Sequence, residues 1–198
     1  QDGSSSQDVH SLALRVCHCV TTGQDFIYPI VNPPPVSAPW INKTGTMSTG
    51  MQTIDSVRRS VQILHNSSVD YALLECTNLY PSPAEIVSLR GVTDLKEAFP
   101  NAVIGFSDHS IGPEMALASV ALGACILERH YTDTRYRKGP DIINSMDPAE
   151  LRLLIDRSKE IWIAARNPKQ RSKSEDAVYK FARASVVADR DLSSGHII

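Results

Sequence analysis

No run of apolar residues in this sequence approaches the roughly 20 needed to cross a bilayer. The net charge is only −2, so the chain lacks the clustered positive charge that nucleic-acid binding requires. Residues 1–8 are polar and show no basic segment followed by an apolar one, which a signal peptide would have. We therefore expect no membrane span and no nucleic-acid partner.

Cysteine is also scarce, with four residues in the chain. Cys76 and Cys125 lie within apolar runs, where a cysteine is usually a small buried hydrophobic residue. Disulfides form mainly in oxidising compartments, and the small secreted domains that depend on them are dense in cysteine. A cytoplasmic protein with reduced thiols is the expectation.

From about residue 46 to residue 166, short apolar runs alternate with amphipathic stretches. Apolar runs of this length are typical of buried parallel strands. Helices are predicted between them from an apolar face over residues 53–64, a capping sequence at Ser82, a proline at position 113 and a second capping sequence at Asp147. The predicted strands are residues 46–48, 71–76, 102–106 and 124–128.

This alternation places the chain in the α/β class, with parallel strands and right-handed crossovers. An open doubly wound sheet and a (β/α)8 barrel of the TIM type both fit the rhythm. Polar residues follow each of the four strands, and barrels build their active sites from all the carboxyl ends of their strands, whereas open sheets use one switch point. The pattern therefore favours half of a barrel.

His109 and His130 follow two neighbouring predicted strands, so both imidazoles are expected at one place above the sheet. Two histidines with oxygens from solvent and substrate would suit a catalytic divalent ion. The alternative is that both only cap strand ends by hydrogen bonding.

Ser48, Asn78 and Ser107 form a second group at neighbouring strand ends, where hydroxyl and amide groups can donate to an anion such as phosphate. The alternative is ordinary loop chemistry, because serine and asparagine favour turns. Asp141 closes a long charged loop after His130, and such a loop can fold over a site. Asp141 is therefore a candidate substrate ligand.

Several stretches of sequence, in this order, resemble the sialic acid synthase family, which includes N-acylneuraminate, legionaminate and pseudaminate synthases and spore-coat polysaccharide proteins. The matching stretches are Ser48-Thr-Gly-Met51, Leu74-Glu-Cys-Thr-Asn-Leu-Tyr-Pro81, Gly105-Phe-Ser-Asp-His109, Val120-Ala-Leu-Gly-Ala124, Leu127-Glu-Arg-His130 and Gly139-Pro-Asp141. The resemblance implies that residues 41–166 are the second half of the synthase barrel.

The same resemblance implies a reaction and a set of roles. Such enzymes condense phosphoenolpyruvate with an N-acylated amino sugar such as N-acetylmannosamine, giving a nonulosonic (sialic) acid and phosphate, with Mn²⁺ or Mg²⁺ as cofactor and a homodimer as the assembly. His109 and His130 match the metal-binding, catalytic histidines. Ser48, Asn78 and Ser107 match positions that hold phosphoenolpyruvate, and Tyr80 and Asp141 match positions that contact the sugar.

The other segments depart from the family pattern. Residues 1–40 look irregular and show no match to the first barrel half, which should supply a lysine and a carboxylate. Residues 167–183 read as a linker, and residues 184–198 resemble the start of an antifreeze-like domain. The alternative function is therefore an inactive remnant, or a metal- and anion-binding protein of the same family.

Overall fold

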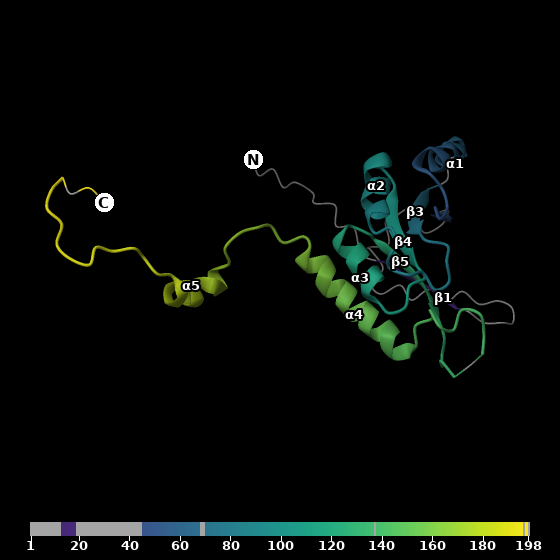
Figure 1. The fold of residues 1–198 in the computed structure, drawn as a ribbon. Helices are drawn as coiled ribbons and strands as arrows, with labels where there is room; N and C mark the ends of the chain where they lie inside the picture. Colours follow the sequence, from purple (N-terminus) through teal and green to yellow (C-terminus); the bar gives the residue numbers. More distant parts are fainter. Residues whose placement is uncertain (1–12, 19–44, 68–69, 137, 196, 198) are drawn as a thin grey trace, which may run out of the picture. The chain divides into compact units, whose positions relative to one another are not determined.

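The computed structural model describes residues 13–18, 45–67, 70–136, 138–195 and 197. The chain divides into two units, Gln1–Arg166 and Asn167–Ile198. The first unit holds the sheet and the longer helices (Figure 1).

The sheet of the first unit is parallel throughout, with the strand order β1-β5-β4-β3-β2. Strands β2 to β5 and the helices between them form a parallel β/α half-barrel, as the sequence predicts. The first strand lies beside the last one, which is the adjacency that closes a complete β/α barrel. The strands are β1 Ala13–His18, β2 Gly45–Ser48, β3 Tyr71–Cys76, β4 Val103–Asp108 and β5 Ile126–Tyr131.

The expectation of irregular structure over residues 1–40 is wrong for Ala13–His18, which forms β1 and pairs with β5. The reason is a long-range contact, because the open edge of β5 supplies backbone hydrogen-bond partners to Ala13–His18. A short apolar run in a polar context does not reveal this pairing by itself. The rest of that segment lies outside the described residues.

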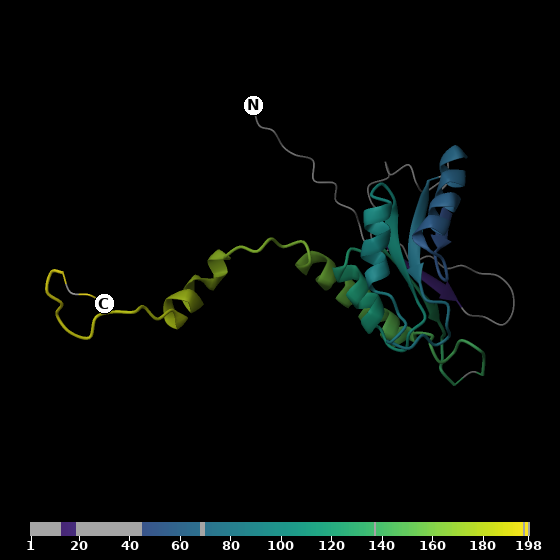
Figure 2. The same cartoon turned by 45° about the horizontal axis from the view of Figure 1, so that its top comes forward.

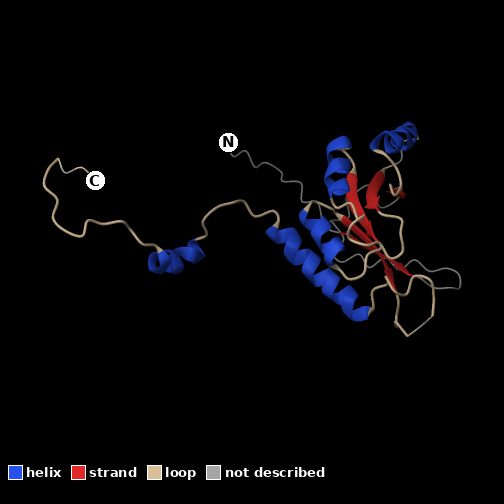
Figure 3. Ribbon diagram, viewed as in Figure 1, coloured by secondary structure: helices blue, strands red, loops and turns tan. Residues whose placement is uncertain are grey.

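Four helices alternate with the strands of the half-barrel (Figure 3). Helices α2, α3 and α4 run along the same side of the sheet, as the two views in Figures 1 and 2 show. Helix α2 contacts β3 and β4, and α3 contacts β4 and α4. The helices are α1 Ile54–Asn66, α2 Arg90–Ala98, α3 Glu114–Ala121 and α4 Pro148–Ala164.

Three of the predicted helix starts are confirmed. The Thr53 side chain accepts a hydrogen bond from the Ser56 amide at the start of α1. Pro113 precedes α3, and α4 begins with a complete capping box between Asp147 and Glu150. The Thr53 and Asp147 caps each satisfy an amide group that has no partner inside the helix.

The helix predicted to open at Ser82 is an error, because α2 begins only at Arg90. The Ser82 hydroxyl donates instead to the carbonyl oxygens of Thr77 and Leu79, at 3.0 and 2.6 Å. Its amide donates to the carbonyl of His109 at 3.0 Å. Ser82 therefore joins the loops after β3 and β4, and the capping sequence makes only a turn.

Side chains of alternate strand residues point to opposite faces of the sheet, as the pleat requires. The face toward the helices carries the buried core, formed by strand residues such as Leu73, Ile104, Phe106 and Leu127 together with Val92 of α2. The opposite face becomes polar toward the carboxyl ends of the strands, where Ser107 contacts Glu128. The site residues therefore lie on the face away from the helices.

The carboxyl group of Glu75 lies on the helix side of this sheet. Glu75 of β3 packs against Gly91 of α2 so closely that a β-carbon on Gly91 would lie 2.4 Å from the carboxyl carbon. Burial raises the pKa of Glu75 to about 7; the negative charge of Asp94 adds to the rise, and a hydrogen bond with Thr49 opposes it. Glu75 therefore takes up a proton near neutral pH in the folded state.

Glu75→Gln is expected to change how stability depends on pH. Between the ordinary pKa of 4.5 and the folded value of about 7, the folded chain binds more protons at Glu75 than the unfolded chain does, so raising the pH through this window lowers the free energy of unfolding. We expect the free energy of unfolding of the wild type to fall by about 1–2 kcal/mol across this window because of Glu75, a value reduced for the partial exposure of the group. The variant should show no such fall from this position.

Urea unfolding at pH 5 and pH 8 measures the difference, with Glu85→Gln on an exposed loop as the control. An equal pH dependence in the wild type and Glu75→Gln would contradict the assignment.

The second unit, described by itself, contains a short 3-10 turn, Lys173–Glu175, and helix α5, Asp176–Ala182. The predicted linker over residues 167–183 is thus partly helical, because Ser172 and Glu175 form a capping box. The antifreeze-like character of residues 184–198 stays a prediction. None of the helices in the described residues has both the length and the apolar character of a membrane span.

Candidate functional site

The predicted site residues gather at the carboxyl ends of β2 to β5. Ser48 ends β2, Asn78 follows β3, and His109 follows β4 directly. Ser107 and His130 lie inside β4 and β5, because both strands run two to three residues further than their apolar runs predict. This shift leaves both histidines at the same edge of the sheet.

The two histidines lie next to one another, with ring centroids 5.3 Å apart and an angle of 51° between the ring planes. Tyr80 covers both: its ring lies 4.0 Å from that of His109 and meets that of His130 edge-on at 5.7 Å. The structure therefore brings together three of the predicted residues, from the loops after β3 and β4 and from β5.

The hydrogen bonding of His109 identifies which ring nitrogen is free to act as a ligand. Its Nδ1 lies 3.0 Å from the carbonyl oxygen of Thr77. Because a carbonyl can only accept, Nδ1 carries the proton, and Nε2 keeps its lone pair. A backbone carbonyl bonded to one imidazole nitrogen is the usual arrangement of a histidine whose other nitrogen binds a metal.

His130 has a buried nitrogen with no partner. Its Nδ1 makes no hydrogen bond to any residue in the described part of the chain. Burial lowers the pKa of His130 and the neighbouring His109 adds to the effect, while the carboxylates of Asp141 and Glu128 oppose it. The ring is thus held in its neutral form near pH 7, the form that binds metals.

Ser48, Asn78 and Ser107 converge on the thiol of Cys76. The thiol donates to Asn78 Oδ1 at 2.8 Å, and the Ser48 and Ser107 hydroxyls lie near enough to influence its pKa. Burial raises the pKa of Cys76, and the neighbouring Ser48 and Ser107 hydroxyls oppose the rise. The group predicted to hold an anion is therefore one compact cluster, with a protonated thiol at its centre.

The backbone approaches this cluster closely at Gly50. A β-carbon there would lie 2.2 Å from Asn78 Oδ1, so only glycine leaves room for the asparagine side chain. The turn after β2 thus holds Asn78 against the strand ends.

Glu128 is a site residue that the sequence prediction missed. Its Oε1 accepts a hydrogen bond from Ser107 Oγ at 3.1 Å, and its charge acts on His130, two residues further along β5. The two-residue spacing puts both side chains on one face of the strand. The two-residue spacing is visible in the sequence. Because the predicted strand ends at Glu128, however, the prediction did not place His130 on the same strand face.

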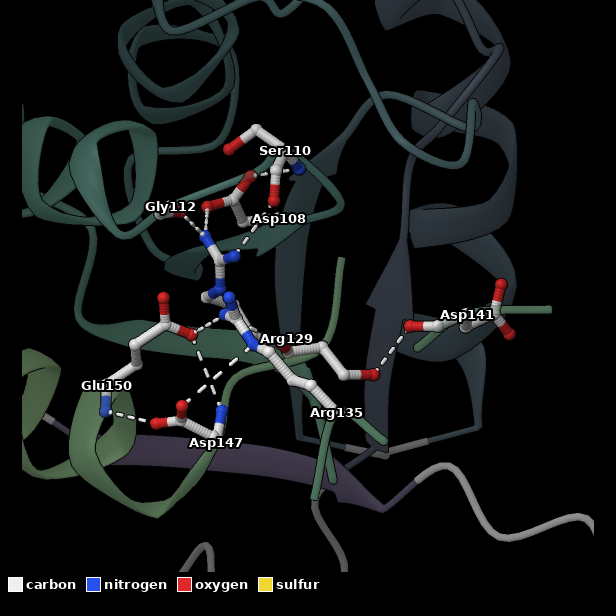
Figure 4. Close-up of polar contacts among 9 residues, drawn as sticks. Asp108, Ser110, Gly112, Arg129, Arg135, Asp141, Asp147 and Glu150 are labelled. Carbon is white, nitrogen blue, oxygen red and sulfur yellow. Dashed lines mark hydrogen bonds and ion pairs between the residues drawn. The ribbon is translucent and has the colours of Figure 1, made fainter. Parts of the chain in front are cut away.

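Asp141 lies in the loop between β5 and α4, half-buried, and its charge acts on His130. Its carbonyl oxygen accepts from Ser145 Oγ at 2.6 Å. Arg135 joins the same loop to the start of α4, through Ser145, Asp147 and Glu150 (Figure 4). The predicted substrate ligand is thus carried on a loop with internal bracing.

A metal at this place would have few protein ligands. Within the described ranges, no group of three or more His, Cys, Asp and Glu side chains has the geometry to hold an ion. The histidine pair could supply two nitrogens, so the remaining positions would belong to substrate and water oxygens. Open positions are what a catalytic ion requires.

Comparison with known proteins gives a consistent result. A profile described as the NeuB family matches residues 39–170. The N,N'-diacetyllegionaminic acid synthase of Campylobacter jejuni is 36% identical over 161 residues, which are 79% of this chain and 48% of that protein. Human N-acetylneuraminate-9-phosphate synthase is 34% identical over 167 residues, 81% of this chain and 46% of that protein.

A solved structure, the N-acetylneuraminic acid synthetase of Leptospira borgpetersenii, superposes with a TM-score of 0.62 at 31% identity. The superposition covers 69% of this chain and 48% of that chain. The chain thus spans about half the length of the curated relatives it matches.

Proposed function

Because this chain belongs to the NeuB family, we propose that it acts in the condensation of phosphoenolpyruvate with N-acetylmannosamine or a related N-acylated amino sugar. The products would be a nonulosonic acid and inorganic phosphate. The observation that carries the proposal is the histidine pair, with rings 5.3 Å apart, lying beside the polar cluster of Ser48, Asn78 and Ser107.

The proposed cofactor is a divalent ion, Mn²⁺ or Mg²⁺, held by His109 and His130. The fit rests on the free Nε2 of His109 and the unpartnered Nδ1 of His130. When bound, such an ion supplies Lewis acidity toward the aldehyde of the open-chain sugar. The neutral state of His130 favours this role, since no proton has to leave before binding.

The cluster of Ser48, Asn78 and Ser107 is proposed to bind phosphoenolpyruvate. Hydroxyl groups rotate to suit their partner, so Ser48 can turn from the Cys76 thiol, and Ser107 from Glu128, toward a phosphate oxygen. Hydrogen-bond donors fixed where negative charge develops make the largest single contribution to the rate acceleration in many enzymes. Burial keeps the thiol protonated, so the Cys76 sulfur itself adds no negative charge next to the anion.

Tyr80 and Asp141 are proposed to contact the sugar. The tyrosine is 47% exposed and its ring lies against that of His109, so a ligand bound at the histidine pair would meet this side chain. In the proposed reaction the enol carbon forms a bond to the aldehyde carbon, water adds to the resulting cation, and phosphate leaves with cleavage of its C–O bond. A homodimer and a cytoplasmic location are part of the same proposal.

Phosphate release tests this function. The purified chain is incubated with phosphoenolpyruvate, Mn²⁺ and N-acetylmannosamine, and then with diacetamido sugars. Release that requires both the sugar and the metal is the expected result. Binding of Mn²⁺ without release from any sugar would contradict the catalytic role and favour a metal- and anion-binding protein of this family.

A further inference from the structure

An ion pair lies directly behind the histidine pair, on the helix side of the sheet. Asp108 of β4 and Arg129 of β5 are partners in the strand register, and their side chains are 1% and 2% exposed. Each is the chain neighbour of one histidine: Asp108 precedes His109, and Arg129 precedes His130. Because side chains alternate along a strand, the ion pair and the rings lie on opposite faces at the same level.

The guanidinium group of Arg129 organises the turn after β4 (Figure 4). Besides Asp108 it donates to the carbonyl oxygens of Ser110, at 2.9 Å, and Gly112, at 2.5 Å. Asp108 in turn accepts from the Ser110 amide at 2.8 Å. One guanidinium from β5 therefore holds the backbone of the turn that follows β4.

This network fixes both histidines relative to each other. His109 lies inside the turn, between Asp108 and Ser110. Both neighbours accept hydrogen bonds from the Arg129 guanidinium, and Asp108 also accepts one from the Ser110 amide. His130 is bonded in the chain to Arg129 itself. A shift of β4 relative to β5 would therefore break the ion pair before it separated the rings.

Stability alone gives a poor reason for charges at this position. Phe106 and Leu127, two residues earlier on the same two strands, are also register partners on the helix side, and both are buried and apolar. Replacing a buried ion pair by apolar residues is often neutral or stabilising. An apolar pair cannot provide the directed hydrogen bonds that the planar guanidinium of Arg129 makes with a carboxylate and two carbonyl oxygens.

We propose that Asp108 and Arg129 are positioning residues that hold His109 and His130 at the separation needed to share a divalent ion. The inference rests on the metal-binding part of the proposed function. It assigns to the pair a role that acts through the histidines, since neither side chain reaches the face where substrate would bind.

Mn²⁺ titration of the purified chain, followed by the electron paramagnetic resonance signal of free Mn²⁺, tests the proposal. Arg129→Lys keeps the positive charge beside Asp108 but loses the guanidinium hydrogen bonds to the carbonyl oxygens of Ser110 and Gly112. The double variant Asp108→Asn, Arg129→Gln removes both charges and leaves none unpaired, so it serves if the lysine variant does not fold. In both we expect Mn²⁺ affinity to fall about tenfold or more.

Val92→Ala is the matched control, because it loosens the core at α2, away from the strand ends. Melting temperatures of all variants are measured together. We expect Val92→Ala to lose stability while its Mn²⁺ affinity stays within about twofold of the wild type.

The outcomes separate the two proposals. If the pair variants also stay within about twofold of the wild-type affinity while losing stability, the pair is only structural and the inference fails, with the proposed function intact. If the wild type itself binds no Mn²⁺, the metal role and the positioning role fail together. Weaker Mn²⁺ binding in the pair variants but not in Val92→Ala supports the inference.

Discussion

Replacing His109 by alanine is expected to lower Mn²⁺ affinity by at least about 100-fold. Even residues that only hydrogen-bond to a metal ligand change metal affinity by about 10- to 100-fold when they are mutated. Sugar-dependent phosphate release should fall about 1000-fold, because Lewis-acid stabilisation is worth several kcal/mol and each 1.36 kcal/mol is a factor of ten. The physical reason is that His109 offers Nε2, with its tautomer set by Thr77.

A matched control for this variant is His65→Ala. His65 is an exposed histidine near the end of α1 whose Nε2 lies 3.0 Å from the Tyr71 hydroxyl. It should leave Mn²⁺ binding and phosphate release unchanged. Equal losses in the two variants, or wild-type Mn²⁺ affinity in His109→Ala, would rule out the histidine site.

Arg129→Met is expected to cause the largest loss of stability, about 3–5 kcal/mol. The substitution leaves the Asp108 carboxylate buried without its partner, at 1% exposure, and removes the donor from two carbonyl oxygens. An unpaired buried charge costs far more than the ion pair contributes by itself. The midpoint and slope of urea unfolding give the free energy.

The control is Arg152→Met, which removes an ion pair with Asp156 on the outer surface of α4, where the arginine is 75% exposed. Exposed pairs of this kind contribute less than about 1 kcal/mol. A loss in Arg129→Met no larger than that in Arg152→Met would show that the buried pair is not needed for the fold.

The helices were predictable where sequence carries its own local signal. Asp147 and Glu150 satisfy the first amides of α4, and Gly123, at φ of +105°, follows α3 with a conformation that favours glycine. The alternation of these helices with apolar runs fixes parallel strands by the handedness rule. The parallel β/α arrangement followed from these two signals, and the polar residues after each strand favoured a half-barrel over an open sheet.

The strand ends were not predictable from apolar patterning. Strands β4 and β5 continue through Ser107, Asp108, Arg129 and His130. Polar residues are register partners there: Ser107 with Glu128, and the buried Asp108 with the buried Arg129. A sequence read one strand at a time shows these residues as the end of the apolar run. Positions that break local patterning in this way are expected at functional sites.

The candidate site was only partly predictable for the same reason. His109 and His130 could be named because both come within three residues of the end of a predicted strand. The cross-strand partners of Glu128 and Arg129 could not, since they depend on which residue of β4 lies opposite: Ser107 for one and Asp108 for the other. Register between strands is a long-range property that a single sequence does not display.

The central claim is that the histidine pair holds a divalent ion at the strand ends. Pulsed electron paramagnetic resonance of Mn²⁺ bound to the chain, with ¹⁵N-labelled histidine, tests it most directly. The account predicts coupling of the Mn²⁺ spin to nitrogens of two imidazoles, reduced to one in His109→Ala and in His130→Ala. Bound Mn²⁺ without ¹⁵N coupling would place the ion elsewhere and contradict the account.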